Sequence, residues 1–198
     1  MSGQTPSQTI GPFFAFGLTP ESYGKNGLAG NVLTDPSAKG EHIRIEGQLL
    51  DGAGQPVNDG LIEVWQANTE GRYNHPEDDR EDVLLEENFK GFGRAATDEN
   101  GGFWFETIKP GRVPGRGNSL QAPHINVIVF ARGMLLHAYT RLYFSDEADA
   151  NVIDVVLSSV KQSRRGTLIA EREEREAGAI YRFDIHLQGD AETVFFDA

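Results

Sequence analysis

The sequence predicts an all-β fold: a β-sandwich core with an extended N-terminal arm and a short helix or two in the connections. Three observations favour this fold class. Short runs of alternating apolar and polar residues recur along the chain, turn residues separate these runs, and no regular helical period fills the gaps. A length of 198 residues also suits one sandwich domain with a sizeable core.

Residues 1–40 show neither helical nor strand periodicity and are rich in Gly, Pro, Ser and Thr. We therefore expect an arm that wraps on a surface here, followed by one sandwich domain over residues 41–198. The domain begins where Ile43 and Ile45 start to alternate with polar residues, as in a half-buried strand.

Similar patterns predict the remaining strands. Residues 98–102, Asp-Glu-Asn-Gly-Gly, separate two β-like runs and indicate a hairpin, and residues 124–131 form the most apolar run. Trp65 is expected in the core, since large aromatic residues on alternating strands usually are. The predicted strands are 42–49, 61–67, 93–97, 103–108, 124–131, 136–144 and 181–187.

Three segments depart from the strand pattern. Residues 152–171 carry apolar residues at mixed spacing, so a short helix is expected there. Residues 171–176, Glu-Arg-Glu-Glu-Arg-Glu, are a run of charges, which usually marks an exposed face. Residues 77–87 are acidic and are expected to form a solvated loop.

Composition limits the function. The chain has no cysteine, so any metal must be held by oxygen and nitrogen ligands. The formal net charge of −12 disfavours nucleic acid and anionic membranes as partners. The N-terminus lacks the features of a signal peptide, so a cytoplasmic location is expected. An acidic protein that binds a carboxylate needs local arginines. The candidates are Arg112, Arg116, Arg132, Arg141, Arg164 and Arg165.

Three motifs carry the chemistry of the chain. They are residues 63–68 (Glu-Val-Trp-Gln-Ala-Asn) with Gly71-Arg72-Tyr73, residues 109–111 (Lys-Pro-Gly), and residues 123–126 (Pro-His-Ile-Asn). Together they resemble the intradiol ring-cleaving dioxygenases. The resemblance implies a β-sandwich and a ferric ion held by two tyrosinates and two histidines, which suits a hard cation that favours anionic oxygen.

Only part of this ligand set is present. Tyr73 and His124 match a tyrosine and a histidine of the family motif, but Val113 stands at the second tyrosine position and Asn126 at the second histidine position. Residues i and i+2 of a strand share a face, so His-x-His could grip one metal and His-x-Asn mostly cannot. Catalytic metal sites typically keep at least three protein ligands. We therefore expect no iron and no catalytic residue on this chain.

The branch of the family that cleaves protocatechuate (3,4-dihydroxybenzoate) uses paired homologous chains, and the resemblance here is to the alpha type. It implies Fe(III) on a partner beta chain, attack by O2, and a 3-carboxy-cis,cis-muconate product. It also implies a heteromer of many pairs in which residues 1–40 pack on the partner. The substrate-binding residues of this chain would then be Arg132, Thr9, Gly11, Pro12 and Phe13.

Two other hypotheses remain open. The chain could be an autonomous non-haem iron catechol dioxygenase, in which Tyr73, His124 and an unexpected ligand such as His75 rebuild a site. A solvated loop is the better interpretation of His75, which precedes acidic residues. The chain could also be a catalytically silent β-sandwich that serves as a binding or assembly module.

Overall fold

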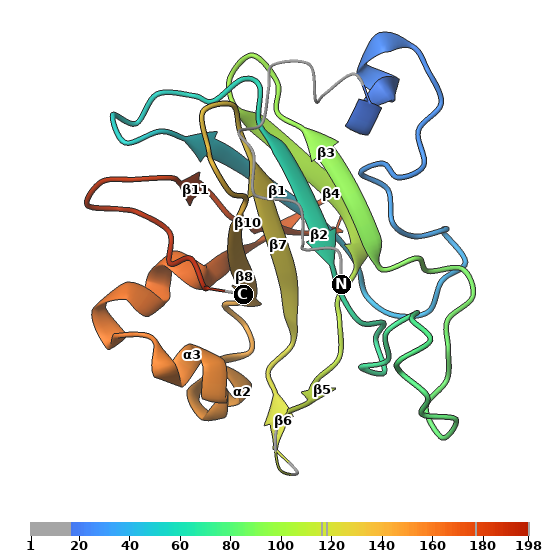
Figure 1. Ribbon diagram of the computed structural model, residues 1–198. Coiled ribbons are helices and arrows are strands. Elements are labelled where there is room, and N and C mark those ends of the chain that lie inside the picture. Colours follow the sequence, from blue (N-terminus) through green and yellow to red (C-terminus); the bar gives the residue numbers. More distant parts are fainter. Residues whose placement is uncertain (1–16, 116, 118, 177, 198) are drawn as a thin grey trace, which may run out of the picture.

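The computed structural model describes residues 17–115, 117, 119–176 and 178–197. Most of the regular structure is β-strand, and the helices are short (Figure 1). The strands are β1 (His42–Leu50), β2 (Leu61–Trp65), β3 (Phe92–Ala96), β4 (Gly102–Ile108), β5 (Val113–Pro114), β6 (Leu120–Gln121), β7 (His124–Phe130), β8 (Ala138–Phe144), β9 (Ile169–Arg175), β10 (Gly178–Arg182) and β11 (Ile185–His186). The helices are α2 (Ala148–Ile153) and α3 (Val155–Ser159), with 3-10 helices η1 (Pro20–Tyr23) and η2 (Gln162–Leu168).

The strands form two facing layers that are joined through β9. One layer runs β4-β1-β10, with β11 pairing beyond the end of β10 along β1, and the other runs β8-β7-β2-β3. Strand β9 pairs antiparallel with β10 and parallel with β8, which makes the sheet continuous and nearly barrel-like. The all-β prediction with a sandwich core is confirmed. The β8–β9 pair is parallel, and the helical segment 148–168 between these two strands returns the chain.

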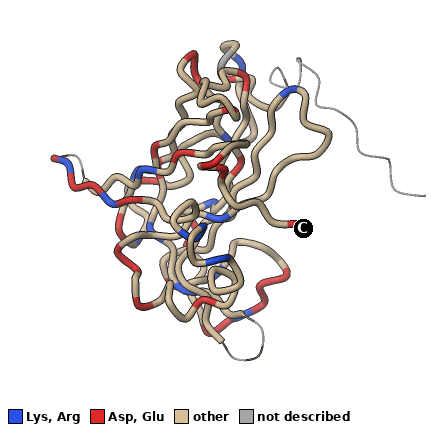
Figure 2. The backbone as a smooth tube through the Cα atoms, turned by 90° about the vertical axis from the view of Figure 1, so that its left-hand side faces the viewer, with Lys and Arg blue, Asp and Glu red and all other residues tan. Residues whose placement is uncertain are grey.

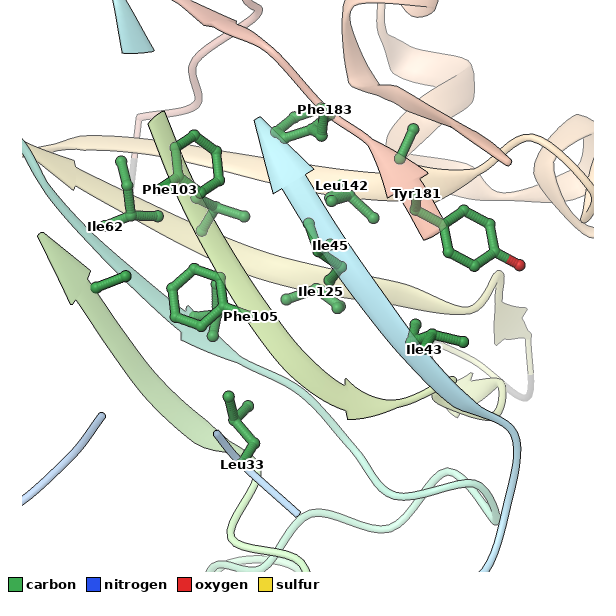
Figure 3. Close-up of a cluster of buried hydrophobic side chains, with 14 of the residues drawn as sticks. Leu33, Ile43, Ile45, Ile62, Phe103, Phe105, Ile125, Leu142, Tyr181 and Phe183 are labelled. Carbon is green, nitrogen blue, oxygen red and sulfur yellow. The ribbon is translucent and has the colours of Figure 1, made fainter. Parts of the chain in front are cut away.

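The core fills the space between the two layers (Figure 3). Ile45 of β1 and Phe105 of β4 point toward Ile125 of β7 and Leu142 of β8, and all four are almost fully buried. The alternating pattern of the sequence places these residues on the inner faces, because successive side chains of a strand point to opposite sides. Each such side chain contributes about 1.5–3 kcal/mol when it is buried.

The hairpin predicted at residues 98–102 is wrong in its pairing. The turn itself forms, with the Asp98 carboxylate accepting hydrogen bonds from the N–H groups of Asn100 and Gly102 (both 2.8 Å). However, β3 pairs with β2 and β4 pairs with β1, so the turn carries the chain from one layer to the other. Turn residues determine that the chain reverses, but they do not determine which strand each arm will join.

Two more predictions need correction. The charged run at 171–176 is mostly exposed, as expected, but most of it forms β9, which the sequence analysis did not predict. Its residues from Glu171 on are all charged and show no apolar alternation, so it does not look like a half-buried strand. The strand predicted over 181–187 is two strands, β10 and β11, interrupted at Phe183 and Asp184. In Figure 2 acidic residues are spread over several loops and strands, with basic residues between them.

The described half of the N-terminal region packs on its own sandwich. Leu33 is buried in the core between bridges that join Val32 to Glu106 and Thr34 to Phe89. The packing of residues 1–40 on a partner chain stays a prediction. None of the helices in the described part of the chain is long and apolar enough to cross a membrane.

Candidate functional site

Two loops that carry family motifs are joined by hydrogen bonds at one end of the sandwich. Asn68 and Gly71 belong to the loop that follows β2, and Gly111 belongs to the turn that follows β4. The Gly111 N–H donates to the Asn68 carbonyl (2.9 Å), and the Asn68 side chain accepts from the Arg72 N–H (2.9 Å). Gly71 has a φ of 76°, and a Cβ there would lie 1.9 Å from the Arg112 carbonyl oxygen. Glycine is therefore required for this close approach of the two backbones.

The buried Gln66 side chain links the same two segments. Its amide nitrogen donates to the carbonyl of Ile108 (2.9 Å), and its oxygen accepts from the Thr107 hydroxyl (2.8 Å). The Trp-Gln-Ala motif is thus tied to the end of β4, directly before the Lys-Pro-Gly turn. These contacts determine where the residues that follow each loop, Tyr73 and Val113, emerge.

Tyr73 and Val113 line the same pocket, which has a volume of about 450 Å³. The Tyr73 ring stacks on Trp65, with ring centroids 5.7 Å apart and an interplanar angle of 20°. The expectation that Trp65 lies in the core is wrong: it is half-buried on the outer face of β2, where it forms a wall of this pocket. The lining residues are Trp65, Tyr73, His75, Glu77, Asp78, Asp79, Arg80, Val113 and Pro114.

The acidic loop is a loop, as predicted, but part of it holds Tyr73 in place. The Asp78 carboxylate accepts from the Tyr73 N–H (2.8 Å) and pairs with Arg80 (2.6 Å). The hydrogen bond from Arg80 is the main cause that lowers the pKa of Asp78 to about 2. Burial raises the pKa of the Tyr73 hydroxyl, and the charge of Arg141 and a hydrogen bond with Asn126 oppose that effect. Tyr73 is therefore a neutral phenol at pH 7.

His124 begins β7 and is almost fully buried. Its Nδ1 lies 2.8 Å from the Ala122 carbonyl oxygen, an acceptor, so the proton sits on Nδ1 and Nε2 keeps its lone pair. Burial lowers the pKa of His124 to about 4, and the positive charge of Arg141 acts in the same direction. The imidazole is therefore neutral and retains the tautomer that a metal ligand needs.

A buried carboxylate positions this segment. Asp154, at the start of α3, accepts from the Ala122 N–H (2.8 Å), the Leu157 N–H (2.8 Å) and the Tyr143 hydroxyl (3.1 Å). Tyr143 in turn packs against the His124 ring, with centroids 5.8 Å apart. Asp154 thus holds both the loop that enters β7 and the neighbour of His124 on β8.

Asn126 lies where the second histidine would be. It shares a face with His124, and its amide contacts the Trp65 carbonyl (3.4 Å). Directly opposite Asn126 on β8 is Arg141, whose Nη1 donates to the Gln121 side chain (2.7 Å). The sequence analysis singled out Arg141 as a possible carboxylate binder, but it did not predict this position.

These residues do not fit a ferric ion. The family arrangement needs two tyrosinates and two imidazoles, and here one neutral phenol and one imidazole face a valine, an amide and a guanidinium. Across the described part of the chain, no group of three or more His, Asp or Glu side chains could hold a metal ion. His75, the possible replacement ligand, is exposed, and its Nδ1 already accepts from the Glu77 N–H (3.2 Å).

Arg132 lies at the opposite end of β7 from His124. Figure 1 shows the β7–β8 turn, which contains Arg132, at one end of the molecule and the β5–β6 ribbon at the other. The seven residues of β7 separate the two ends by about 20 Å. The Arg132 side chain is 61% exposed and pairs with Asp59 through Nε.

The other tracked arginines have structural partners. Arg112, Arg164 and Arg165 donate to backbone carbonyls of Leu120 (3.0 Å), Glu192 (2.6 Å) and Val160 (2.9 Å). Arg116 lies outside the described residues, and so do Thr9, Gly11, Pro12 and Phe13. Of the five predicted substrate-binding residues, the structure therefore places Arg132 alone, and their role stays a prediction.

Comparisons with known proteins agree with these motifs. Residues 19–189 match the family model described as Dioxygenase. The chain is 45% identical to the protocatechuate 3,4-dioxygenase alpha chain of Burkholderia cepacia, covering 98% of this chain and 97% of that one. It is 46% identical to the alpha chain of Pseudomonas putida, covering 98% and 96%. The Burkholderia cepacia beta chain is 34% identical, covering 82% and 71%.

A solved structure has the same fold. The dioxygenase domain of a dioxygenase and carbohydrate-binding protein fusion from Streptomyces sp. SirexAA-E matches with a TM-score of 0.63 and 26% identity, covering 94% of this chain and 99% of that one. Non-haem Fe(III) chemistry belongs to this family. The chain is a member of the intradiol ring-cleavage dioxygenase family, and two of its near full-length relatives are alpha chains of protocatechuate 3,4-dioxygenase.

Proposed function

We propose that this chain is the non-iron alpha subunit of a protocatechuate 3,4-dioxygenase. It would complete the substrate pocket at an interface with a homologous beta chain, which would hold the Fe(III) in a cytoplasmic heteromer of several alpha/beta pairs. The complex would cleave 3,4-dihydroxybenzoate with O2 to 3-carboxy-cis,cis-muconate, a step of aromatic degradation by the beta-ketoadipate route. The ferric ion on the partner would supply the activation of the catechol ring.

The observation that carries this proposal is the incomplete ligand set in an otherwise intact family fold. Tyr73, Val113 and the pocket are assembled as the motifs predict, yet Val113 and Asn126 cannot act as the missing tyrosinate and imidazole. Near full-length identity to alpha chains supports the same assignment. A chain with this site can contribute to the reaction only through a site on another chain.

Arg132 is the residue that we assign to the substrate carboxylate. It projects from a tight turn, where Gly133 has a φ of 84°, and its guanidinium is the most exposed member of its ion pair. A planar donor fork suits the carboxylate of a benzoate. Thr9, Gly11, Pro12 and Phe13 would line the same pocket with backbone groups and the Phe13 ring, as the resemblance implies.

The test is the Arg132→Ala variant co-expressed with its cognate beta chain. We expect the KM for protocatechuate to rise about 10- to 100-fold, because a hydrogen-bonded charge pair is worth roughly 1.5–3 kcal/mol. Iron content per heteromer should not change. An unchanged KM and turnover would contradict the assignment of Arg132.

The control is Arg175→Ala, which removes another exposed arginine, paired with Glu173 on β9. It should leave the KM unchanged. A second control uses catechol, which lacks the carboxylate: the Arg132→Ala heteromer should lose its preference for protocatechuate over catechol. Iron and activity in the isolated chain would instead favour the autonomous enzyme, and no gain on adding a beta chain would favour the silent module.

A further inference from the structure

The outer face of the β2–β7–β8 sheet carries a row of three side chains that end in polar groups. The strand register places Trp65 opposite Asn126 and Asn126 opposite Arg141. Residues directly opposite in antiparallel strands project from the same face. Arg141 therefore lies beside the position of the lost histidine, on the face that also bears His124 and Tyr143.

Arg141 is a half-buried cation, and the nearest carboxylate, Asp154, is held by the Tyr143 hydroxyl (3.1 Å) and by backbone N–H groups. Its Nη1 donates to the Gln121 side chain (2.7 Å), and it forms no salt bridge with any carboxylate among the described residues. Arg141 is two residues from Tyr143 on β8 and opposite Asn126, which is two residues from His124 on β7, and its charge acts on Tyr73, His124 and Tyr143. The two retained ligand-type residues are thus grouped around a cation that belongs to the protein.

We call the four family-motif positions Tyr73, Val113, His124 and Asn126 the remnant site. We propose that the Arg141 guanidinium takes the place of the metal as the cation of this site, and that it excludes metal ions even when a missing ligand is restored. The inference rests on the part of the proposed function that assigns the iron to the partner, and it adds a physical cause. A fixed positive charge repels a metal cation, and repulsion at short range in a half-buried site is only weakly screened.

The charge of Arg141 also removes the need for a metal. A guanidinium has only N–H donors, so it can donate to the lone pairs of the Tyr73 and Tyr143 oxygens, as it does to the Gln121 side chain (2.7 Å). The absence of metal ligands at positions 113 and 126 and the presence of an internal cation at position 141 then have the same consequence: the site does not hold a metal ion.

The test is metal binding by the isolated chain with Asn126→His, which recreates a His-x-His pair next to Tyr73. The probe is Co(II), followed by its visible absorption. In this background Arg141→Met removes the cation, and Arg141→Lys is the matched control that keeps it. We expect Co(II) to bind at least about 10-fold more tightly to the Asn126→His/Arg141→Met chain than to Asn126→His alone or Asn126→His/Arg141→Lys.

Equal binding by the Met and Lys variants would overturn the proposal, and so would the absence of binding in both while circular dichroism shows that they are folded. If the Met variant does not fold, Arg141→Gln supplies a neutral side chain that can keep the Gln121 contact. Turnover by the wild-type heteromer reports on the proposed function instead, so the two can fail separately.

Discussion

The two faces of β7 differ in what their residues do. The inner face carries Ile125, Val127 and Val129, which are buried in the core, and the outer face carries His124 and Asn126 beside the remnant site. Inner positions need only an apolar group of suitable volume. Outer positions need particular donor atoms in particular places. A strand can therefore keep its fold while one substitution on its other face ends its metal chemistry.

The strongest test of this comparison replaces one residue from each face. Ile125→Ala should lower the free energy of unfolding by about 2–5 kcal/mol, because it leaves a cavity between the layers. Asn126→Ala should cost about 0.5–1.5 kcal/mol, since its amide makes one long contact at 3.4 Å with the Trp65 carbonyl and one hydrogen bond with the Tyr73 hydroxyl. Urea denaturation measures both, and equal costs would break the comparison.

The titration of His124 is the next largest effect. Its folded-state pKa of about 4 is below the ordinary value of 6.5, so the unfolded chain binds the proton first as the pH falls. Stability from the neutral imidazole is full above pH 6.5 and is lost as the pH falls toward 4, by about 3 kcal/mol in total. Comparing wild type with His124→Phe at pH 7 and pH 4.5 isolates this term, because the carboxylates titrate in both chains. Parallel stability curves would show that His124 does not titrate as a buried base.

Asp154 supports the outer face from the helical segment. Asp154→Asn should lower the free energy of unfolding by about 1–3 kcal/mol, because an amide cannot accept all three hydrogen bonds that the carboxylate accepts. The His124 ring should also become more mobile, which nuclear magnetic resonance of its imidazole protons can detect. A fully stable variant with an unchanged ring would mean that the core alone positions β7.

Arg132 should have the smallest effect on stability. Its side chain is largely exposed, so Arg132→Ala should change the free energy of unfolding by about 0.5 kcal/mol or less. Thermal unfolding of the isolated chain measures this. A large loss would make Arg132 a structural residue and would weaken any interpretation of its kinetic variant.

Much of the fold could be predicted because alternation reports which residues face the core. The strands around Ile45 and Ile125 follow from that pattern alone. The pairing of β3 and β4 could not be predicted, because Asp98 and the glycines after it determine only a reversal of the chain. Strand β9 was missed because most of its residues are charged and show no apolar alternation.

The site was predictable where a motif names its residues and unpredictable where register decides. Tyr73, Val113 and His124 were found from their motifs. Arg141 was a candidate carboxylate binder, but its place in this site was not predicted, because its position opposite Asn126 depends on how many residues the β7–β8 turn uses. Trp65 was assigned to the wrong face, because a large aromatic residue can form the wall of an outer pocket as readily as it fills a core.

The separation of Arg132 from His124 along β7 has a consequence for how such a chain can change over generations. Substitutions at sites more than about 10 Å apart usually have additive effects. The end that carries the remnant site can therefore accumulate changes such as Val113 and Asn126 with no penalty at the end that carries Arg132. A duplicated chain of this shape can lose metal binding at one end and keep the role of Arg132 at the other, because the length of β7 separates the two ends and a substitution at one has little effect on the other.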